Sequence, residues 1–175
     1  MDSSDFFQFL ATRSSVREFT GEAIDNREIT YLFDCAATAP SAGNLEAWDV
    51  VMVRDPGRRG ELSEAALDQP QVREAPLLLI VCANYVRSMS RYGERGVLYA
   101  VQDATIACTY LMLAAHSRNL RSCWVGAFDE DAVRGVLSLP SHTRPVAILC
   151  IGKGSLPREL TGRLPVSEHL HHETW

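Results

Sequence analysis

The sequence lacks the features that mark several special classes of protein. It has no internal repeat and no low-complexity segment. Of its 175 residues, 46% are hydrophobic and 22% are charged, which is close to the average for globular proteins and far from a disordered composition. This length is within the usual size of one compact domain. We therefore expect one domain, residues 1–175, with a sizeable core.

The cysteines lack the spacing of a redox or metal motif. No two of them form a CxxC pair, their number is odd, and most lie in apolar runs such as 77–83. None has a neighbouring histidine or basic setting that would activate a nucleophile. We therefore expect free, buried thiols in a reducing compartment. The cysteines are Cys35, Cys82, Cys108, Cys123 and Cys150.

An excess of positive charge is also missing. The formal charge of −5 disfavours nucleic acid or an anionic membrane as a partner, unless basic residues cluster locally. Asp2 and Asp5 occupy positions where a signal peptide needs positive charge, so we expect a cytoplasmic protein. Polar residues interrupt the apolar run 97–115, which favours a buried helix over a membrane span.

The spacing of apolar residues predicts a mixture of helices and strands. Strands are expected over 48–53, 77–83, 121–125 and 145–151, the second of them covered on both faces. Helices are expected over 3–12, after a capping box of Asp25 and Glu28, through Leu62 and Leu67, over 97–119, and from near Asp129 to before Pro140. The polar stretch 84–96 is expected to be a loop or a small mobile helix. The tail after Gly152 has too few apolar residues for its own core, so it needs a surface to lie on, its own or a partner's.

Arginines and hydroxyls gather just after the first expected helix. Arg13, Ser14, Ser15 and Arg17 lie within one short segment. A guanidinium offers a fork of donors and serine hydroxyls fill the remaining lone pairs, so this combination suits a phosphate. A solvated helix end is the alternative, because runs of charge are commonly just surface. The segment alone does not decide between the two.

Two further segments place polar groups where ligands are often held. Ser41 and Asn44 follow a helix and precede a strand, so they can point polar side chains at the mouth of that strand. Ordinary turn chemistry is the alternative. Gly126 and Ala127 follow a strand and open a helix, which exposes backbone N–H groups to an anion or an electron-rich ring edge. A plain strand-to-helix turn capped by Asp129 is the alternative there.

Together these segments resemble the FMN-dependent nitroreductase family. Segments 13–19, 40–48 and 124–129, followed by Arg163-Leu164-Pro165 and Trp175, appear in the order seen in that family. Each segment is short and degenerate, but their joint order and spacing are much more specific than any one of them. The resemblance spans nearly the whole chain.

The resemblance implies an α+β, nitroreductase-like fold with a small mixed β-sheet flanked by helices. It implies a homodimer in which the C-terminal arm, residues 152–175, is swapped onto the partner subunit. FMN is the implied cofactor and NADH or NADPH the implied hydride donor. Hydride would pass through flavin N5 to a nitroaromatic, quinone or related small acceptor by a ping-pong mechanism, so no side chain need act as an acid or base.

The resemblance assigns the flavin's anionic end to Arg13, Ser15 and, from the tail, Arg163, with Ser14 beside them. Arg17 would lie near flavin N1 and the C2 carbonyl, where a cation stabilises the negative charge of the reduced ring.

The remaining candidates are implied to surround the ring. Ser41 and Asn44 resemble residues that reach it from the other subunit, and Gly126 and Ala127 resemble the backbone donors that face N5 and O4. The family therefore implies a site that one subunit cannot complete.

The chain departs from the family pattern at two places. Ser14 stands where the family commonly has a second arginine, so phosphate affinity is either weaker or supported elsewhere. Glu46-Ala47 replaces a common Gln-Pro, and this carboxylate either alters substrate preference or points to solvent. Lys153 is a further candidate for the phosphate, on a loose alignment.

Other functions fit the same residues. One is a specialised enzyme of the same fold, such as a reductive dehalogenase or a flavin-fragmenting enzyme. Another is a flavin-binding storage or sensing module with little turnover. A third is a relative that binds no flavin because Ser14 replaced an arginine.

Two patterns are set aside. Gly152-Lys153-Gly154 lacks the upstream glycine of a P-loop. His169, His171 and His172 lie near glutamates in the tail, but a polar tail produces such clusters easily, so we predict no metal site.

Overall fold

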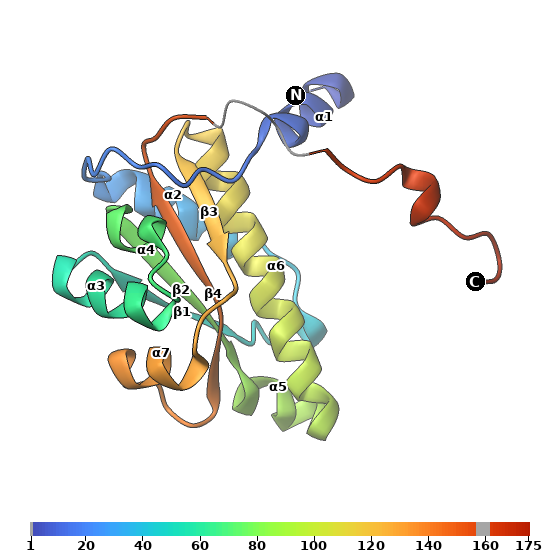
Figure 1. Ribbon diagram of the computed structural model, residues 1–175. Helices are drawn as coiled ribbons and strands as arrows, with labels where there is room; N and C mark the ends of the chain where they lie inside the picture. Colours follow the sequence, from blue (N-terminus) through green and yellow to red (C-terminus); the bar gives the residue numbers. More distant parts are fainter. Residues whose placement is uncertain (1, 157–161) are drawn as a thin grey trace.

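The computed structural model describes residues 2–156 and 162–175, and its centre is a four-stranded sheet (Figure 1). Its strands are β1 (Trp48–Val53), β2 (Leu77–Asn84), β3 (Arg121–Val125) and β4 (Thr143–Gly152). Their spatial order is β1-β2-β4-β3, and every neighbouring pair is antiparallel.

The α+β class expected from the sequence is confirmed, but the sheet is antiparallel rather than mixed. Among the described residues, the parallel pairing is limited to an isolated bridge between Ser15 and Ser122. An apolar run such as 77–83 indicates burial on both faces, but it does not indicate the direction of the neighbouring strands.

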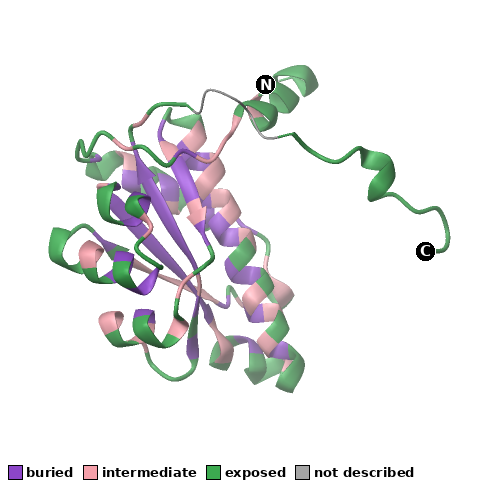
Figure 2. Cartoon of the chain, viewed as in Figure 1, coloured by how far each residue is buried: buried purple, intermediate pink, exposed green. Residues whose placement is uncertain are grey.

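Helices cover both faces of the sheet. Along β2, Leu77, Leu79 and Val81 pack with α2 (Asn26–Ala36) and α6 (Gly96–Ser117), while the intervening Leu78 and Ile80 face the other side. That other side is covered by α3 (Pro56–Ala65), α4 (Pro70–Glu74) and α7 (Glu130–Leu137). Because side chains alternate along a strand, burial on both faces explains why β2 is continuously apolar. Figure 2 shows the two inner strands of the sheet, β2 and β4, as almost entirely buried.

Helix α6 is the long helix expected over 97–119. Its small residues Ala100, Ala104 and Ala107 are fully buried against the sheet side, whereas Leu98 on another side is 50% exposed. By length and composition alone this helix is able to cross a membrane, which is weak evidence because core helices share those properties. In this chain α6 is a core helix with one side left partly uncovered.

Helix α1 (Ser3–Thr12) and the tail extend from the body of the molecule (Figure 1). Asp2 and Asp5 form a capping box at the start of α1, yet none of its residues is buried, and Phe7 is 66% exposed. Residues 162–175 are all exposed, including the short helix η3 (Val166–Glu168). Part of the expected arm, residues 157–161, lies outside the described residues, and its packing on a partner stays a prediction.

Two local expectations need correction. Asp25 caps α2 by accepting from the Arg27 N–H at 2.7 Å. The expected capping box is incomplete, since the Glu28 carboxylate instead binds Arg118 with both of its oxygens. Helix α3 ends at Ala65, before Leu67, which has a positive φ of 60°. Of the two expectations for stretch 84–96, the structure has the small helix, formed by α5 (Tyr85–Tyr92) and followed by η2 (Gly93–Arg95).

Candidate functional site

The segment after α1 lies along the edge strand β3. The Val16 N–H donates to the Ser122 carbonyl at 2.9 Å, and the Val16 side chain is 1% exposed. Successive side chains of an extended segment point to opposite sides, so Ser15 and Arg17 lie away from the side that Val16 buries. Burial raises the pKa of the Cys123 thiol on β3. The positive charge of Arg17 acts in the opposite direction with a smaller effect.

Arg13 is half-buried at the end of α1. Its Nη1 lies 3.9 Å from the sulfur of Met112 on α6, and none of the ion pairs within residues 2–156 and 162–175 includes it. Burial lowers the pKa of Arg13, and the charge of Arg163 lowers it further. The charge of Arg163 therefore acts on Arg13, although one of these arginines precedes the sheet in sequence and the other follows it.

Ser14 directly follows Arg13 in the chain. Its Oγ is buried and has no hydrogen-bond partner in the described part of the chain. A buried hydroxyl without a partner is costly, so this position favours a bound group that offers a hydrogen-bonding atom.

The loop before β1 is fixed to α6 by a buried carboxylate. Asp103 is 2% exposed, and it accepts hydrogen bonds from the Ala42 N–H at 2.9 Å and the Ala47 N–H at 3.2 Å. The Ser41 hydroxyl accepts from the Glu46 N–H at 3.0 Å, so it also holds the loop together. Asn44 is exposed with a positive φ of 57°, a conformation that asparagine tolerates better than most residues.

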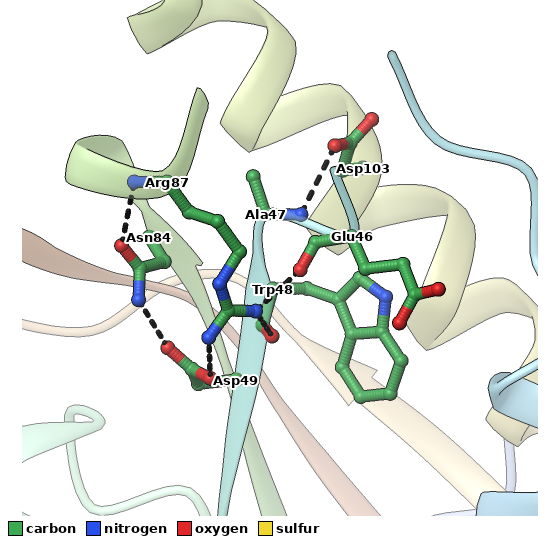
Figure 3. Close-up of polar contacts among 7 residues, drawn as sticks. All are labelled: Glu46, Ala47, Trp48, Asp49, Asn84, Arg87 and Asp103. Atoms are coloured by element: carbon green, nitrogen blue, oxygen red, sulfur yellow. Dashed lines mark hydrogen bonds and ion pairs between the residues drawn. The ribbon is translucent and has the colours of Figure 1, made fainter. Parts of the chain in front are cut away.

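Arg87 on α5 supports the same loop from the other end (Figure 3). Its guanidinium donates to the Glu46 carbonyl, to the Trp48 carbonyl at 3.0 Å and to Asp49 at 2.9 Å. Asn84 donates to the second oxygen of Asp49 at 2.7 Å. The Glu46 carboxylate takes no part in these contacts and its residue is exposed, so the departure at this position adds a negative charge at the surface of the loop.

The turn after β3 is accessible. Gly126 and Ala127 are both exposed, and Gly126 borders a cavity of about 200 Å³ together with Val101 of α6. Asp129 caps α7 by accepting from the Ala132 N–H at 2.9 Å, as expected for a strand-to-helix turn. The turn is therefore an ordinary helix start, and the backbone of its exposed residues Gly126 and Ala127 is accessible to a ligand.

Two of these segments lie beside α6, at different heights along the helix. Arg13 contacts Met112, near the end of α6, whereas Gly126 lines the same cavity as Val101, near its start. We call the region between these two points the strip. A helix rises 1.5 Å per residue, which separates the two ends by roughly 16 Å. Ser41 borders a second cavity that also includes Val101, so within one chain it lies near the Gly126 end and far from Arg13.

Lys153 is committed elsewhere. Its ammonium group forms an ion pair with Glu22 at 2.6 Å, so the structure does not direct it to Arg13. In the tail, the His171 ring stacks on Trp175 at 4.4 Å, and no three potential metal ligands gather within the described ranges.

A comparison with known families identifies the fold. The model of the nitroreductase family matches residues 10–77 and 61–153, which together include every element from the end of α1 to β4. The chain belongs to the nitroreductase family.

Individual known proteins are similar to this chain over most of their length. FMN reductase (NADPH) of Bacillus subtilis is 29% identical over 178 residues, which cover 92% of this chain and 70% of that protein. 5,6-Dimethylbenzimidazole synthase of Rhodospirillum rubrum is 31% identical over 170 residues, covering 84% and 79%. The crystal structure of nitroreductase A from Vibrio parahaemolyticus has a TM-score of 0.90 and 26% identity, covering 100% of this chain and 78% of that chain.

Sequence reasoning missed two residues that shape this nitroreductase-family site. Asp103 is one of the polar residues that interrupt the apolar run 97–115, and a carboxylate inside a buried helix needs donors, so it signals a tertiary contact. Arg87 lay in a stretch without clear periodicity, and no local pattern indicated that it would hold the carbonyl groups of the loop.

Proposed function

We propose that this chain is an NAD(P)H-dependent FMN oxidoreductase that acts as a homodimer and passes hydride to a small acceptor such as a quinone or nitroaromatic compound. Membership of the nitroreductase family supports this, as does the similarity to an FMN reductase (NADPH). Free thiols and a nicotinamide donor both fit a reducing cytoplasm.

The arginine pair and the buried serine carry the proposal. The charges of Arg13 and Arg163 act on each other, and we propose that both guanidinium groups donate to phosphate oxygens. The partnerless Ser14 hydroxyl supplies one more hydrogen bond beside them. These groups fit the phosphate of FMN, with Ser15 next along the segment toward the ribityl chain. The serine that replaces the family's second arginine is therefore compatible with flavin binding.

In this proposal, Arg17, Gly126 and Ala127 would lie around the flavin ring. Bound FMN supplies hydride acceptance and release at its N5 atom. Arg17 would hold a positive charge near the N1 side, which favours the reduced, anionic ring. Gly126 and Ala127 would direct backbone N–H groups at the opposite edge, where their exposure leaves room for the ring. No side chain is needed as an acid or base.

A second copy of the chain completes the site in this proposal. Phe6 and Phe7 of α1 are 51% and 66% exposed, and Leu164 and Trp175 of the tail are 66% and 101% exposed. Side chains of this size gain free energy when a partner covers them. We place Ser41 and Asn44 against the ring held by the partner, because they resemble the family residues that reach the ring from the other subunit.

The visible absorption spectrum of the purified protein, with FMN added back, tests this function directly. We expect a flavin spectrum, a dimer on a sizing column, and oxidation of NADH or NADPH with a quinone. Arg13→Gln should weaken FMN binding by roughly 10- to 100-fold, since it removes hydrogen bonds to a charged group. Arg73→Gln, which removes an exposed arginine paired with Asp68 at 3.8 Å, is the matched control. A protein that stays colourless and monomeric with saturating FMN would contradict the proposal, and an FMN-loaded protein without turnover would favour a storage or sensing module.

A flavin-fragmenting activity is the second candidate. The observation that favours it is the 31% identity to a 5,6-dimethylbenzimidazole synthase. The dimethyl-substituted benzene ring of that product, with its two nitrogens, matches one end of the flavin ring. Incubation of the reduced, FMN-loaded protein with oxygen distinguishes the two. Appearance of dimethylbenzimidazole with permanent loss of flavin absorbance supports fragmentation, and full return of the oxidised spectrum supports the oxidoreductase.

A further inference from the structure

Two arginines and two tyrosines form an ordered group at the junction of α5, η2 and α6. The Arg91 guanidinium lies 5.6 Å from the centre of the Tyr92 ring, and that of Arg95 lies 5.4 Å from the centre of the Tyr99 ring. The tyrosine rings meet edge to face at 4.9 Å. We name this group the arginine–tyrosine cluster (Arg91, Tyr92, Arg95 and Tyr99).

Several contacts hold the cluster in place. Arg95 Nε donates to the Tyr99 hydroxyl at 2.7 Å, and Arg91 Nη1 donates to the Gly43 carbonyl at 3.3 Å. A Cβ on Gly43 would lie 2.3 Å from the Tyr92 hydroxyl, so only glycine permits this approach of loop and ring. The guanidinium groups are thus oriented before any ligand arrives, which reduces the entropy cost of binding.

Tyr99 is the member of the cluster that lines the larger of the two cavities next to Val101, and the Arg95 guanidinium contacts Tyr99. This cavity has a volume of about 480 Å³, and Tyr99, Ser41 and Ala42 contribute to its lining. That volume is in the range of sites for small molecules. In the proposed dimer, Ser41 faces the partner's flavin ring, so the cluster stands at the approach to the ring.

The charges of Arg91 and Arg95 are not balanced by carboxylates. The ion pairs found within residues 2–156 and 162–175 use other cations, such as Arg87 and Arg118. Glu94 lies between the two arginines in sequence, but no hydrogen bond in the described ranges joins it to either. In a chain of net charge −5, these two exposed cations, which contact the cavity residue Tyr99 and the loop at Gly43, offer positive charge to an anionic ligand.

We propose that Arg91 and Arg95 bind the 2′-phosphate of NADPH and give the enzyme a preference for NADPH over NADH. The inference rests on the proposed function, since it names the donor for the same site. A guanidinium matches a phosphate through paired N–H donors, and the tyrosine rings hold each guanidinium in a fixed plane. NADH has only the pyrophosphate, so it gains nothing from a pair of cations placed for the additional dianion.

Steady-state kinetics of the FMN-loaded dimer test the preference. Arg91→Ala and Arg95→Ala should each raise the KM for NADPH about three- to tenfold, and the double variant by more, because each removes a charge-assisted hydrogen bond at an exposed site. The KM for NADH, the kcat and the flavin content should stay within twofold of the unchanged protein. Arg95→Lys, which keeps the charge without the fork, should fall between. Arg73→Ala is the matched control for loss of an exposed arginine.

Equilibrium binding gives a readout that does not depend on turnover. Adenosine 2′,5′-bisphosphate should bind at least several-fold more tightly than adenosine 5′-monophosphate, and the double variant should lose this difference. A lack of flavin or of donor oxidation in the unchanged protein counts against the proposed function, whereas this binding measurement still tests the arginines. Three outcomes would overturn the inference. The unchanged protein binds the two nucleotides with equal affinity, the variants change the KM for NADPH and NADH equally, or the double variant dissociates into monomers.

Discussion

The carboxylate of Asp103 joins the middle of α6 to Ala42 by a hydrogen bond of 2.9 Å from the Ala42 N–H. Its second oxygen accepts from the Ala47 N–H, so one buried side chain fixes both ends of the loop that carries Ser41 and Asn44. The loop consequently has a defined shape before a ligand or a second subunit contacts it.

Removal of this carboxylate should loosen the loop. Asp103→Ala leaves two backbone N–H groups without their acceptor, so we expect the free energy of unfolding to fall by about 2–4 kcal/mol. FMN binding should weaken as well, because Ser41 and Asn44 lose their position. Urea unfolding and a fluorescence titration with FMN measure the two effects. Asp34→Ala, which removes an exposed carboxylate from α2, is the control; equal effects of both variants would contradict this role.

Replacement of Arg17 should slow hydride uptake while leaving the flavin bound. The charge of Arg17 is proposed to stabilise the reduced ring, so Arg17→Gln should lower the rate of flavin reduction about tenfold. Stopped-flow absorbance of the FMN-loaded protein with NADPH provides this rate. Arg27→Gln, at an exposed position of α2, controls for the loss of charge. An unchanged rate in Arg17→Gln would remove this residue from the proposed ring site.

The attachment of α1 should depend on pH through His116. Its Nε2 lies 3.0 Å from the Phe9 carbonyl and 3.2 Å from the Thr12 hydroxyl, and its ring contacts that of Phe9. Burial lowers the pKa of His116 below its ordinary value of 6.5, and the nearby charges of Arg121 and Arg13 lower it further against the raising effect of the Phe9 carbonyl.

A histidine whose pKa is lower in the folded state binds a proton more readily when unfolded. Its stabilising effect is therefore present above pH 6.5 and is lost as the pH falls from there through the lowered pKa. Urea unfolding at several pH values should show a decrease in stability over this range, and His116→Gln should make the decrease shallower. His142→Gln is the control for loss of a histidine. The same pH profile in His116→Gln and the unchanged protein would argue against the effect.

The thiols should differ in reactivity. Cys35 is partly exposed, while Cys82, Cys108, Cys123 and Cys150 are buried. Burial raises the pKa of Cys82 to about 12 and also raises the pKa of Cys108, Cys123 and Cys150. Because the thiolate is the reactive form, a disulfide reagent at pH 8 should modify Cys35 rapidly and the others only after unfolding. Loss of the rapid phase in Cys35→Ser is expected, and two or more rapid thiols in the folded protein would be inconsistent with this burial.

Local structure was largely predictable because its causes lie within a few residues. The continuous apolar run over 77–83 identified β2, and the apolar residues over 97–119 identified α6. The segment 84–96 was less accessible to this reasoning, since its helix depends on a cap from Asn84 and on packing against α6. The family resemblance selected the right fold because it combined several distant segments, each too short to decide alone.

The sequence by itself determined the helices, the strands, the buried thiols and the types of residue present at the candidate site. Only the tertiary structure decided the antiparallel order of the strands, the effect of the Arg163 charge on Arg13, and the contact of Asp103 with the loop of Ser41. Backbone preference and the period of side chains act over a few residues, so they are readable along the chain. Contacts between distant residues depend on the path of the whole chain, and that path is fixed only when both faces of the sheet are covered.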